Sequence, residues 1–185
     1  MTQVVIENPV INLPQYSIVP LDTARHRREH FVCESPELTN FLHKQARKEM
    51  VARASACFVL VATSDPGRIL GFYTLLQTSV SLSALPEALT KKLPRYPELG
   101  ATLIGRLARD LEWRGKEIGP LLLVDALRRS ARLSDEAGAV VVVTDPKDQK
   151  ARAFYESHGF LALDERRLFM PMKEILEREA RGWAA

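Results

Sequence analysis

Residues 105–119, GRLARDLEWRGKEIG, decide the fold, because the rest of the chain can be placed around them. They overlap an apolar run at residues 101–107 that is typical of a β-strand. A short polar turn follows at residues 114–119, and apolar residues then recur at helical spacing as far as Leu133. The stretch therefore predicts a strand, a tight turn and a long helix in immediate succession.

The polar turn has the features of an anion site. The first backbone N–H groups of a helix have no partner within the helix, and the positive end of the helix dipole lies at the same place. Arg114 and Lys116 add formal positive charge to the turn. We therefore expect it to hold a phosphate group, although an ordinary strand-to-helix connection would have a similar sequence.

The composition limits the kind of protein, its partners and its cellular compartment. A chain of 185 residues, 46% hydrophobic and 26% charged, suits one globular domain with a full core. The net charge of +3 permits a nucleic-acid partner without requiring one. Cys33 and Cys57 lie in or beside apolar runs, which favours free, buried thiols in a reducing compartment. No run is long enough to span a membrane and the N-terminus lacks a secretory pattern, so we expect a cytoplasmic protein.

The N-terminal part of the chain is predicted to contain an arm, a strand and two helices. Residues 1–14 form the arm, residues 16–21 a first strand, and residues 24–31 a short helix rich in basic residues. Ser35 is expected to cap the second helix, because proline and an acidic residue follow it in the first turn. The apolar residues of that helix share one face, and its basic residues point elsewhere.

The remaining elements alternate between strands and helices. A hairpin at residues 57–62 and 69–82 precedes a proline- and lysine-rich loop at residues 83–100, which is a natural place for a substrate-facing element. The strand at residues 139–144 should pair in parallel with the one at residues 101–107, as in a right-handed βαβ unit. The last predicted elements are a helix at residues 148–157, short strands at 160–164 and 168–172, and a helix at 173–183.

A second motif lies in the helix after the second parallel strand, where residues 149–160 read QKARAFYESHGF. Taken alone, Tyr155 would be a half-buried helix tyrosine and Gly159 a helix terminator. Taken with the upstream turn and the βαβ unit between them, the two motifs resemble those of the GNAT N-acetyltransferases. Two positions depart from that family's pattern, because Glu117 stands where a glycine is usual and Gln149 replaces an asparagine.

The resemblance implies both a fold and a site. The fold would be α/β (α+β), with a mixed central sheet split between two parallel strands and helices on both faces. The domain would cover residues 15–173, and residues 174–185 would form a C-terminal helix or tail. Acetyl-CoA would be the cosubstrate, no metal would take part, and Tyr155 would protonate the departing thiolate. The residues implied in binding acetyl-CoA are Leu107, Ala108 and Arg109 for the pantetheine, Arg114, Gly115, Lys116, Ile118 and Gly119 for the pyrophosphate, and also Gln149.

Further short motifs make the chain similar to the toxin-type GNATs of bacterial toxin–antitoxin operons. These motifs are Phe31, Cys33, Leu38, Phe41 and Leu42 near the start, Gly71-Phe72-Tyr73, GRLA-x-D at residues 105–110, AFYE at residues 153–156, and RRLFMPM at residues 166–172. Members of that group acetylate the α-amine of aminoacyl-tRNA, which stops translation, and a ribbon-helix-helix antitoxin neutralises them. The resemblance therefore implies tRNA and such an antitoxin as partners, and it is compatible with a homodimer. The basic residues expected to face the tRNA are Arg106, Lys44, Arg47, Lys48, Lys91, Lys92 and Arg95.

Two other functions remain open from the sequence. A GNAT enzyme that acts on a small amine or on a protein N-terminus would have an acidic or apolar acceptor cleft. A catalytically silent, CoA-binding regulatory module would bind acetyl-CoA weakly or not at all. The carboxylate of Glu117 beside a pyrophosphate would favour this silent module.

Overall fold

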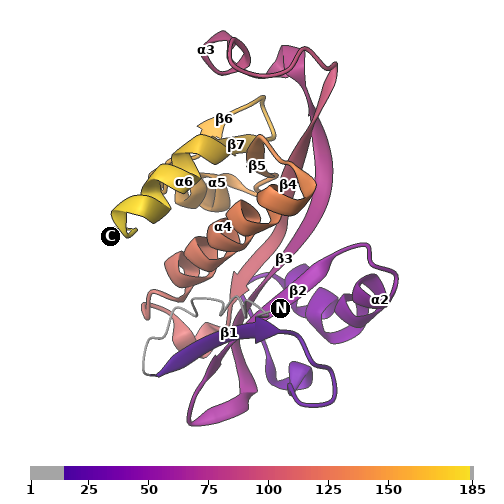
Figure 1. Ribbon diagram of the computed structural model, residues 1–185. Coiled ribbons are helices and arrows are strands. Elements are labelled where there is room, and N and C mark those ends of the chain that lie inside the picture. The colour runs from indigo at the N-terminus through magenta and orange to yellow at the C-terminus, as the bar shows by residue number, and fades with distance from the viewer. Residues whose placement is uncertain (1–14, 184–185) are drawn as a thin grey trace, which may run out of the picture.

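The computed structural model describes residues 15–183, so the expected arm at residues 1–14 lies outside the described residues. The described chain forms one mixed sheet with strand order β1-β2-β3-β4-β5-β7-β6 (Figure 1). The strands are β1 (Tyr16–Pro20), β2 (Ala56–Ala62), β3 (Asp65–Ser81), β4 (Glu98–Arg109), β5 (Val141–Thr144), β6 (Leu161–Ala162) and β7 (Leu168–Pro171). The helices are α1 (Pro36–Asn40), α2 (Ala46–Val51), α3 (Glu87–Thr90), α4 (Ile118–Ala137), α5 (Gln149–Ser157) and α6 (Met172–Arg181).

The sheet splits between its two parallel strands, as expected. β4 and β5 pair in parallel only from Ala101 opposite Val141 to Ile104 opposite Thr144, and β4 then continues alone to Arg109. The register between β3 and β4 shifts at the same point, because Gly105 has no partner on β3. Such a β-bulge bends a strand and increases its local twist. β4 therefore turns away from β5 at the residue where β5 ends.

Helices cover both faces of the sheet. Leu122 on α4 and Ile175 on α6 share one core with Tyr73 on β3. Phe72, the preceding residue of β3, points to the opposite face and packs with Phe41, which lies between α1 and α2. α6 is thus anchored in the core, and the expected domain boundary near residue 173 stays a prediction. Across residues 15–183, no helix combines the length and the apolar character that a membrane crossing requires.

The prediction of a helix at residues 24–31 is wrong. The structure has only a single 3₁₀ turn there, η1 (Arg28–His30). The basic side chains are engaged in tertiary contacts instead, because Arg27 pairs with Asp65 and Arg28 donates to backbone carbonyl oxygens of the next helical segment. These contacts fix the segment in a non-helical path.

The helix predicted from Ser35 begins as expected but contains an irregular turn. The Ser35 hydroxyl accepts the Leu38 N–H at 3.4 Å, which caps α1. A π-helical turn, η2 (Phe41–Gln45), then separates α1 from α2. The Arg28 guanidinium donates to the carbonyl oxygens of Leu42 and His43 at 3.4 and 3.0 Å. We infer that these bonds support the wider turn, which is a feature often found at functional sites.

Candidate active site

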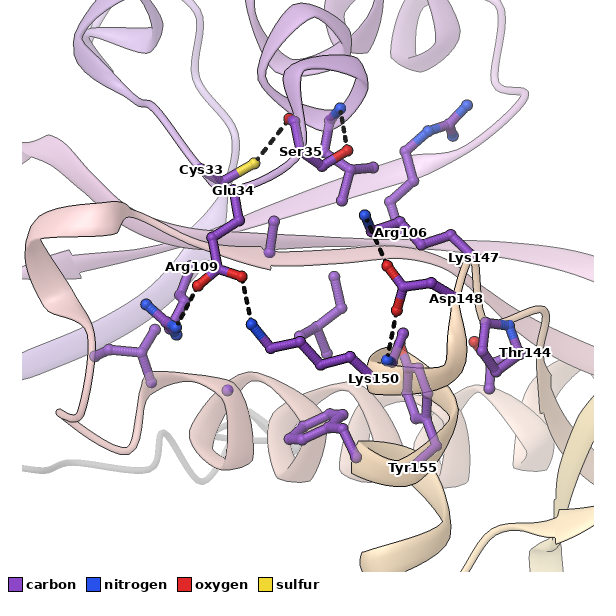
Figure 2. A pocket seen from close by; sticks show the side chains of 18 of the residues that line it. Cys33, Glu34, Ser35, Arg106, Arg109, Thr144, Lys147, Asp148, Lys150 and Tyr155 are labelled. Carbon is purple, nitrogen blue, oxygen red and sulfur yellow. Dashed lines mark hydrogen bonds and ion pairs between the residues drawn. The ribbon is translucent and has the colours of Figure 1, made fainter.

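A cavity of about 470 Å³ lies where β4 leaves β5 (Figure 2). Its walls come from the end of β4, the turn before α4, the start of α5 and the segment at residues 33–38. Residues 105–109 of β4 line it, and β5 does not pair with them. The backbone polar groups on that edge of β4 are therefore open to a ligand that runs alongside the strand.

Left-handed backbone shapes the turn before α4. Gly115 has a φ of 75° and Glu117 a φ of 56°, so both lie in the region that favours glycine. A Cβ added at Gly119 would lie 3.3 Å from the ring of Phe154, so the glycine lets α5 pack closely against the first turn of α4. Ile118 and Gly119 line the cavity, and their N–H groups belong to the first turn, which lacks helical acceptors. This geometry suits a bound phosphate.

Replacing Glu117 with glycine is expected to leave acetyl-CoA affinity unchanged or to tighten it. A non-glycine residue in the left-handed region carries about 1 kcal/mol of strain, and the carboxylate repels an anion at the start of α4. Isothermal titration calorimetry with acetyl-CoA measures the effect. Glu117→Gln is the matched control, because it removes the charge and keeps the backbone strain. Loss of binding in Glu117→Gly would show that the carboxylate has a positive role.

Tyr155 projects from α5 into the cavity (Figure 2). Asp148 caps this helix, since its carboxylate accepts the Ala151 N–H at 2.8 Å. The Tyr155 side chain is only 6% exposed, and burial raises its pKa to about 12, with a hydrogen bond to Thr144 opposing part of the rise. The phenol therefore keeps its proton at neutral pH and is available as a proton donor.

Two further carboxylates in the cavity lining are already engaged. Both oxygens of Asp145 accept hydrogen bonds from Arg167, each at 2.7 Å. The backbone N–H of Ala151 is the main cause that holds the pKa of Asp148 below its usual range. Neither group is suited to take a proton from a substrate amine. Within residues 15–183, no group of three His, Cys, Asp or Glu side chains is arranged to hold a metal ion.

A third carboxylate, that of Glu34, bridges two walls of the cavity (Figure 2). It accepts a hydrogen bond from Arg109 on β4 at 3.1 Å and another from Lys150 on α5. Lys150 is the first cause of a lowered pKa of Glu34, to which Arg109 also contributes, so the carboxylate stays ionised. Lys150 is 71% exposed, so solvent weakens the bridge and allows it to open.

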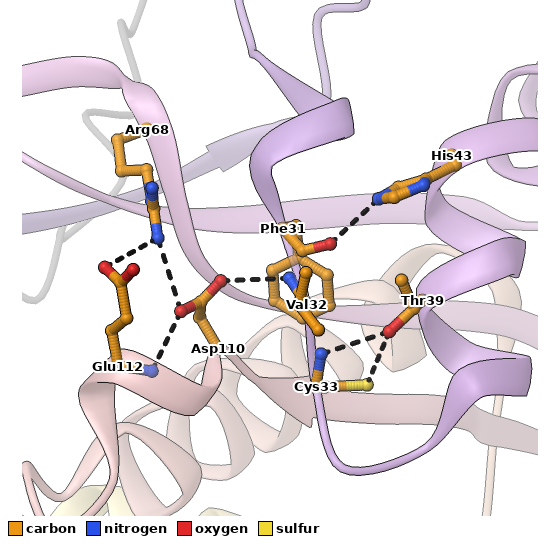
Figure 3. A network of polar contacts seen from close by, with 8 residues as sticks. All are labelled: Phe31, Val32, Cys33, Thr39, His43, Arg68, Asp110 and Glu112. Atoms are coloured by element: carbon orange, nitrogen blue, oxygen red, sulfur yellow. Dashed lines mark hydrogen bonds and ion pairs between the residues drawn. The ribbon is translucent and has the colours of Figure 1, made fainter.

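The segment that carries Glu34 is fixed by the buried side chain of Asp110 (Figure 3). One carboxylate oxygen accepts the Val32 N–H at 3.1 Å. The other accepts the Glu112 N–H at 3.0 Å and lies 3.4 Å from a guanidinium nitrogen of Arg68. Asp110, the last residue of the GRLA-x-D motif, thus ties the end of β4 to the segment that forms one wall of the cavity.

The structure brings part of the expected site together. The expected residues that line the cavity are Tyr155, Arg106, Leu107, Ala108, Arg109, Gly115, Ile118 and Gly119. The expected residues outside its lining are Arg114, Lys116 and Gln149, and also Lys44, Arg47, Lys48, Lys91, Lys92 and Arg95. Sequence analysis missed Glu34, Thr144 and Lys150. No local pattern marks them, because Glu34 and Lys150 are 116 positions apart.

Comparisons with known proteins agree with this geometry. A family profile described as "Acetyltransferase (GNAT) domain" matches residues 55–161. The probable toxin TacT of Sinorhizobium fredii (strain NBRC 101917 / NGR234) is 34% identical over 168 residues, which cover 85% of this chain and 92% of TacT. A tRNA-acetylating toxin of Mycobacterium tuberculosis (strain ATCC 25618 / H37Rv) is 32% identical over 130 residues, which cover 70% of this chain and 75% of that protein.

A solved structure shows the same fold. AtaT complexed with acetyl-methionyl-tRNAfMet superposes with a TM-score of 0.80 at 26% identity, over 88% of this chain and 98% of AtaT. The family profile alone spans more than half of the chain, and it includes the turn before α4 and the whole of the second motif. The chain belongs to the GNAT family of acetyltransferases.

Proposed function

We propose that this GNAT enzyme is the toxin of a toxin–antitoxin pair, which acetylates the α-amine of aminoacyl-tRNA with acetyl-CoA and thereby blocks translation. The observation that carries the proposal is the cavity in which the open end of β4, the first turn of α4 and Tyr155 meet. Relatives named as a probable toxin and as a tRNA-acetylating toxin support it. A ribbon-helix-helix antitoxin, a homodimer and a cytoplasmic location are parts of the same proposal.

The open edge of β4 is assigned to the pantetheine of acetyl-CoA. Amide groups of pantetheine would hydrogen-bond to the backbone of Leu107, Ala108 and Arg109 as a neighbouring strand does. The first turn of α4 would hold the pyrophosphate through backbone N–H groups and the helix dipole. The residues assigned to the pyrophosphate are Arg114, Gly115, Lys116, Ile118 and Gly119. Gln149, at the start of α5, is also assigned to acetyl-CoA binding.

Tyr155 is assigned as the general acid. The substrate amine forms the new C–N bond, the C–S bond of the thioester breaks, and the departing thiolate takes the phenolic proton of Tyr155. The nitrogen releases one proton to solvent as the amide forms, and a proton from solvent restores the phenol. The amine must be neutral to attack. Since α-amines titrate at about pH 7.7–8.0, a fraction is neutral at physiological pH and no strong base is required. This agrees with the engaged state of Glu34, Asp145 and Asp148.

The strongest alternative is a GNAT enzyme that acts on a small amine or on a protein N-terminus. Carboxylates in the cavity lining could attract a cationic amine, but Glu34 is bonded to Arg109 and Lys150. Asp145 is likewise bonded to Arg167. A silent CoA-binding module is disfavoured by the position of Tyr155 in the cavity and by Glu117, whose left-handed backbone still allows α4 to begin at Ile118.

Incubation with radiolabelled acetyl-CoA and total charged tRNA tests the proposal. We expect the label in the acyl part of one or a few aminoacyl-tRNAs, identified after nuclease digestion and chromatography. Uncharged tRNA, polyamines and peptide N-termini serve as competing acceptors. Label in a small amine or a peptide would establish the alternative, and no label in any acceptor would favour the silent module.

Removing the charges of Lys44, Arg47 and Lys48 together is expected to lower kcat/KM for charged tRNA at low salt and to leave acetyl-CoA affinity intact. All three side chains are exposed on η2 and α2. Removal of one phosphate-binding charge should reduce the log–log salt dependence by roughly one unit. Lys173→Gln with Arg181→Gln, on α6, is the control. Acetylation that is indifferent to both the triple substitution and salt would rule out this surface as the tRNA groove.

A further inference from the structure

We propose that Arg106 is a stacking platform for the unpaired base at the acceptor end of the tRNA. The inference deepens the proposed function and rests on it. It replaces the simpler expectation that Arg106 binds a phosphate through its charge. The geometry around the guanidinium distinguishes these two roles.

One face of the guanidinium rests on a rigid aromatic column. The central carbon of the Arg106 guanidinium lies 3.7 Å from the centre of the Phe41 ring. Phe41 in turn stacks on Phe72, with ring centres 6.0 Å apart and planes inclined by 19°. Both phenylalanines are buried, so neither ring has room to rotate away. The guanidinium plane is the end of this column nearest the cavity.

The edge of the guanidinium is already occupied. Its two terminal nitrogens donate to the two carboxylate oxygens of Glu49, each at 3.3 Å. Ser55 donates to Glu49 at 2.7 Å and fixes that carboxylate. A phosphate clamp needs these same donors and an uncompensated charge. In Arg106, however, the charge is paired and the donors point at Glu49.

The face opposite Phe41 is the surface that remains for a ligand. Arg106 lines the cavity, and its side chain is 28% exposed. The β-bulge at Gly105 sets its place on β4, directly before the residues assigned to pantetheine. An arginine plane backed by an aromatic ring is a surface on which unpaired bases stack.

The position of Arg106 matches the chemistry of the proposed acceptor. In an aminoacyl-tRNA the α-amine is joined through an ester to the ribose of the terminal nucleoside, whose base is unpaired. An amine that reaches the thioester near Tyr155 therefore brings that base to the same cavity. Arg106 is a residue for substrate positioning in this scheme, because the base stacks on it while the amine reacts elsewhere.

The test compares acceptors with and without the nucleoside. The first probe is the 3′-amido-3′-deoxyadenosine conjugate of the amino acid labelled in the charged-tRNA experiment, and the second is the simple amide of that amino acid. Both carry a free α-amine and neither carries a phosphate. We expect the wild-type enzyme to prefer the nucleoside probe on the order of 10-fold or more in kcat/KM, as base stacking allows.

Two variants distinguish stacking on the guanidinium plane of Arg106 from attraction by its positive charge. Arg106→Lys keeps the charge and loses the plane, whereas Arg106→Met loses both. We expect both variants to lose the preference for the nucleoside, because kcat/KM for the nucleoside probe falls toward the value for the amide. Affinity for acetyl-CoA should not change. The salt dependence of tRNA acetylation should remain that of the wild type.

Other outcomes overturn the inference in distinguishable ways. If Arg106→Lys behaves as the wild type and Arg106→Met lowers the log–log salt slope by about one, Arg106 is a phosphate clamp. If the wild type acetylates charged tRNA but shows no preference for the nucleoside probe, Arg106 is not a stacking platform, and the proposed function stands. If the wild type acetylates neither charged tRNA nor the nucleoside probe, the proposed function is wrong, and so is the role of Arg106 that rests on it.

Discussion

Replacing Tyr155 with phenylalanine is expected to lower turnover by roughly 10²–10⁴-fold, which is the usual effect of removing a general acid. Acetyl-CoA affinity should not change. The substitution keeps the ring that packs between Phe154 and Phe160, each with its centre 5.3 Å away, and removes only the hydroxyl. Single-turnover acetylation of charged tRNA measures the chemical step, and calorimetry measures binding.

The pH dependence gives a second readout of the same assignment. A general acid acts in its protonated form. Burial raises the pKa of Tyr155 to about 12, so the phenol keeps its proton well above neutral pH. Activity should therefore rise between about pH 6 and 9 as the amine loses its proton, with no decline caused by Tyr155. Tyr155→Phe should keep this rise at a lower rate, because the rise belongs to the amine.

The exposed Tyr96, outside the cavity lining, supplies the matched control. Tyr96→Phe should leave turnover unchanged. Unchanged turnover in Tyr155→Phe as well would exclude Tyr155 as the proton donor, and Thr144 would then be the next hydroxyl in the cavity to examine. A loss of acetyl-CoA affinity together with turnover would indicate a binding role instead.

The parts of the site that the sequence predicts are those encoded by contiguous residues. The strand, turn and helix around residues 105–119 and the helix around Tyr155 are local patterns with fixed spacing. Their order predicts the parallel pair, and the resemblance to GNAT enzymes implies the split sheet. Glu117 departs from the family pattern, yet its backbone is left-handed, which is the region that glycine enters without strain.

The parts that the sequence did not predict depend on tertiary contacts. A capped helix was expected at residues 24–31, where basic residues cluster, but Arg27 and Arg28 bond to residues that are distant along the chain. The π-helical turn at Phe41 likewise depends on Arg28, and it is not visible in the apolar periodicity. Charge counting also cannot show that Glu49, 57 positions away, pairs with Arg106; the expected role of Arg106 in tRNA binding stays a prediction.

Replacing Asp110 with alanine is expected to destabilise the protein by about 3 kcal/mol, roughly a 150-fold change in the folding equilibrium. The substitution leaves the N–H groups of Val32 and Glu112 without their acceptor and Arg68 without one of its two carboxylate partners. Asp110 is 1% exposed, so water does not readily replace these bonds. Thermal unfolding should show a fall in Tm of about 6–12 °C for a chain of this length.

Two comparisons make the Asp110 result specific. Asp65→Ala removes an exposed carboxylate that pairs with Arg27, and it should cost less than about 1 kcal/mol. Asp110→Asn retains one acceptor oxygen but turns an amide N–H₂ toward a backbone donor, so an intermediate loss is expected.

At a temperature where Asp110→Ala is fully folded, the segment that carries Glu34 should be looser, and acetyl-CoA should dissociate faster. An unchanged Tm in Asp110→Ala would contradict this prediction. It would mean that the contacts of Phe31 and Cys33 with α1 and η2, rather than Asp110, hold this wall of the cavity.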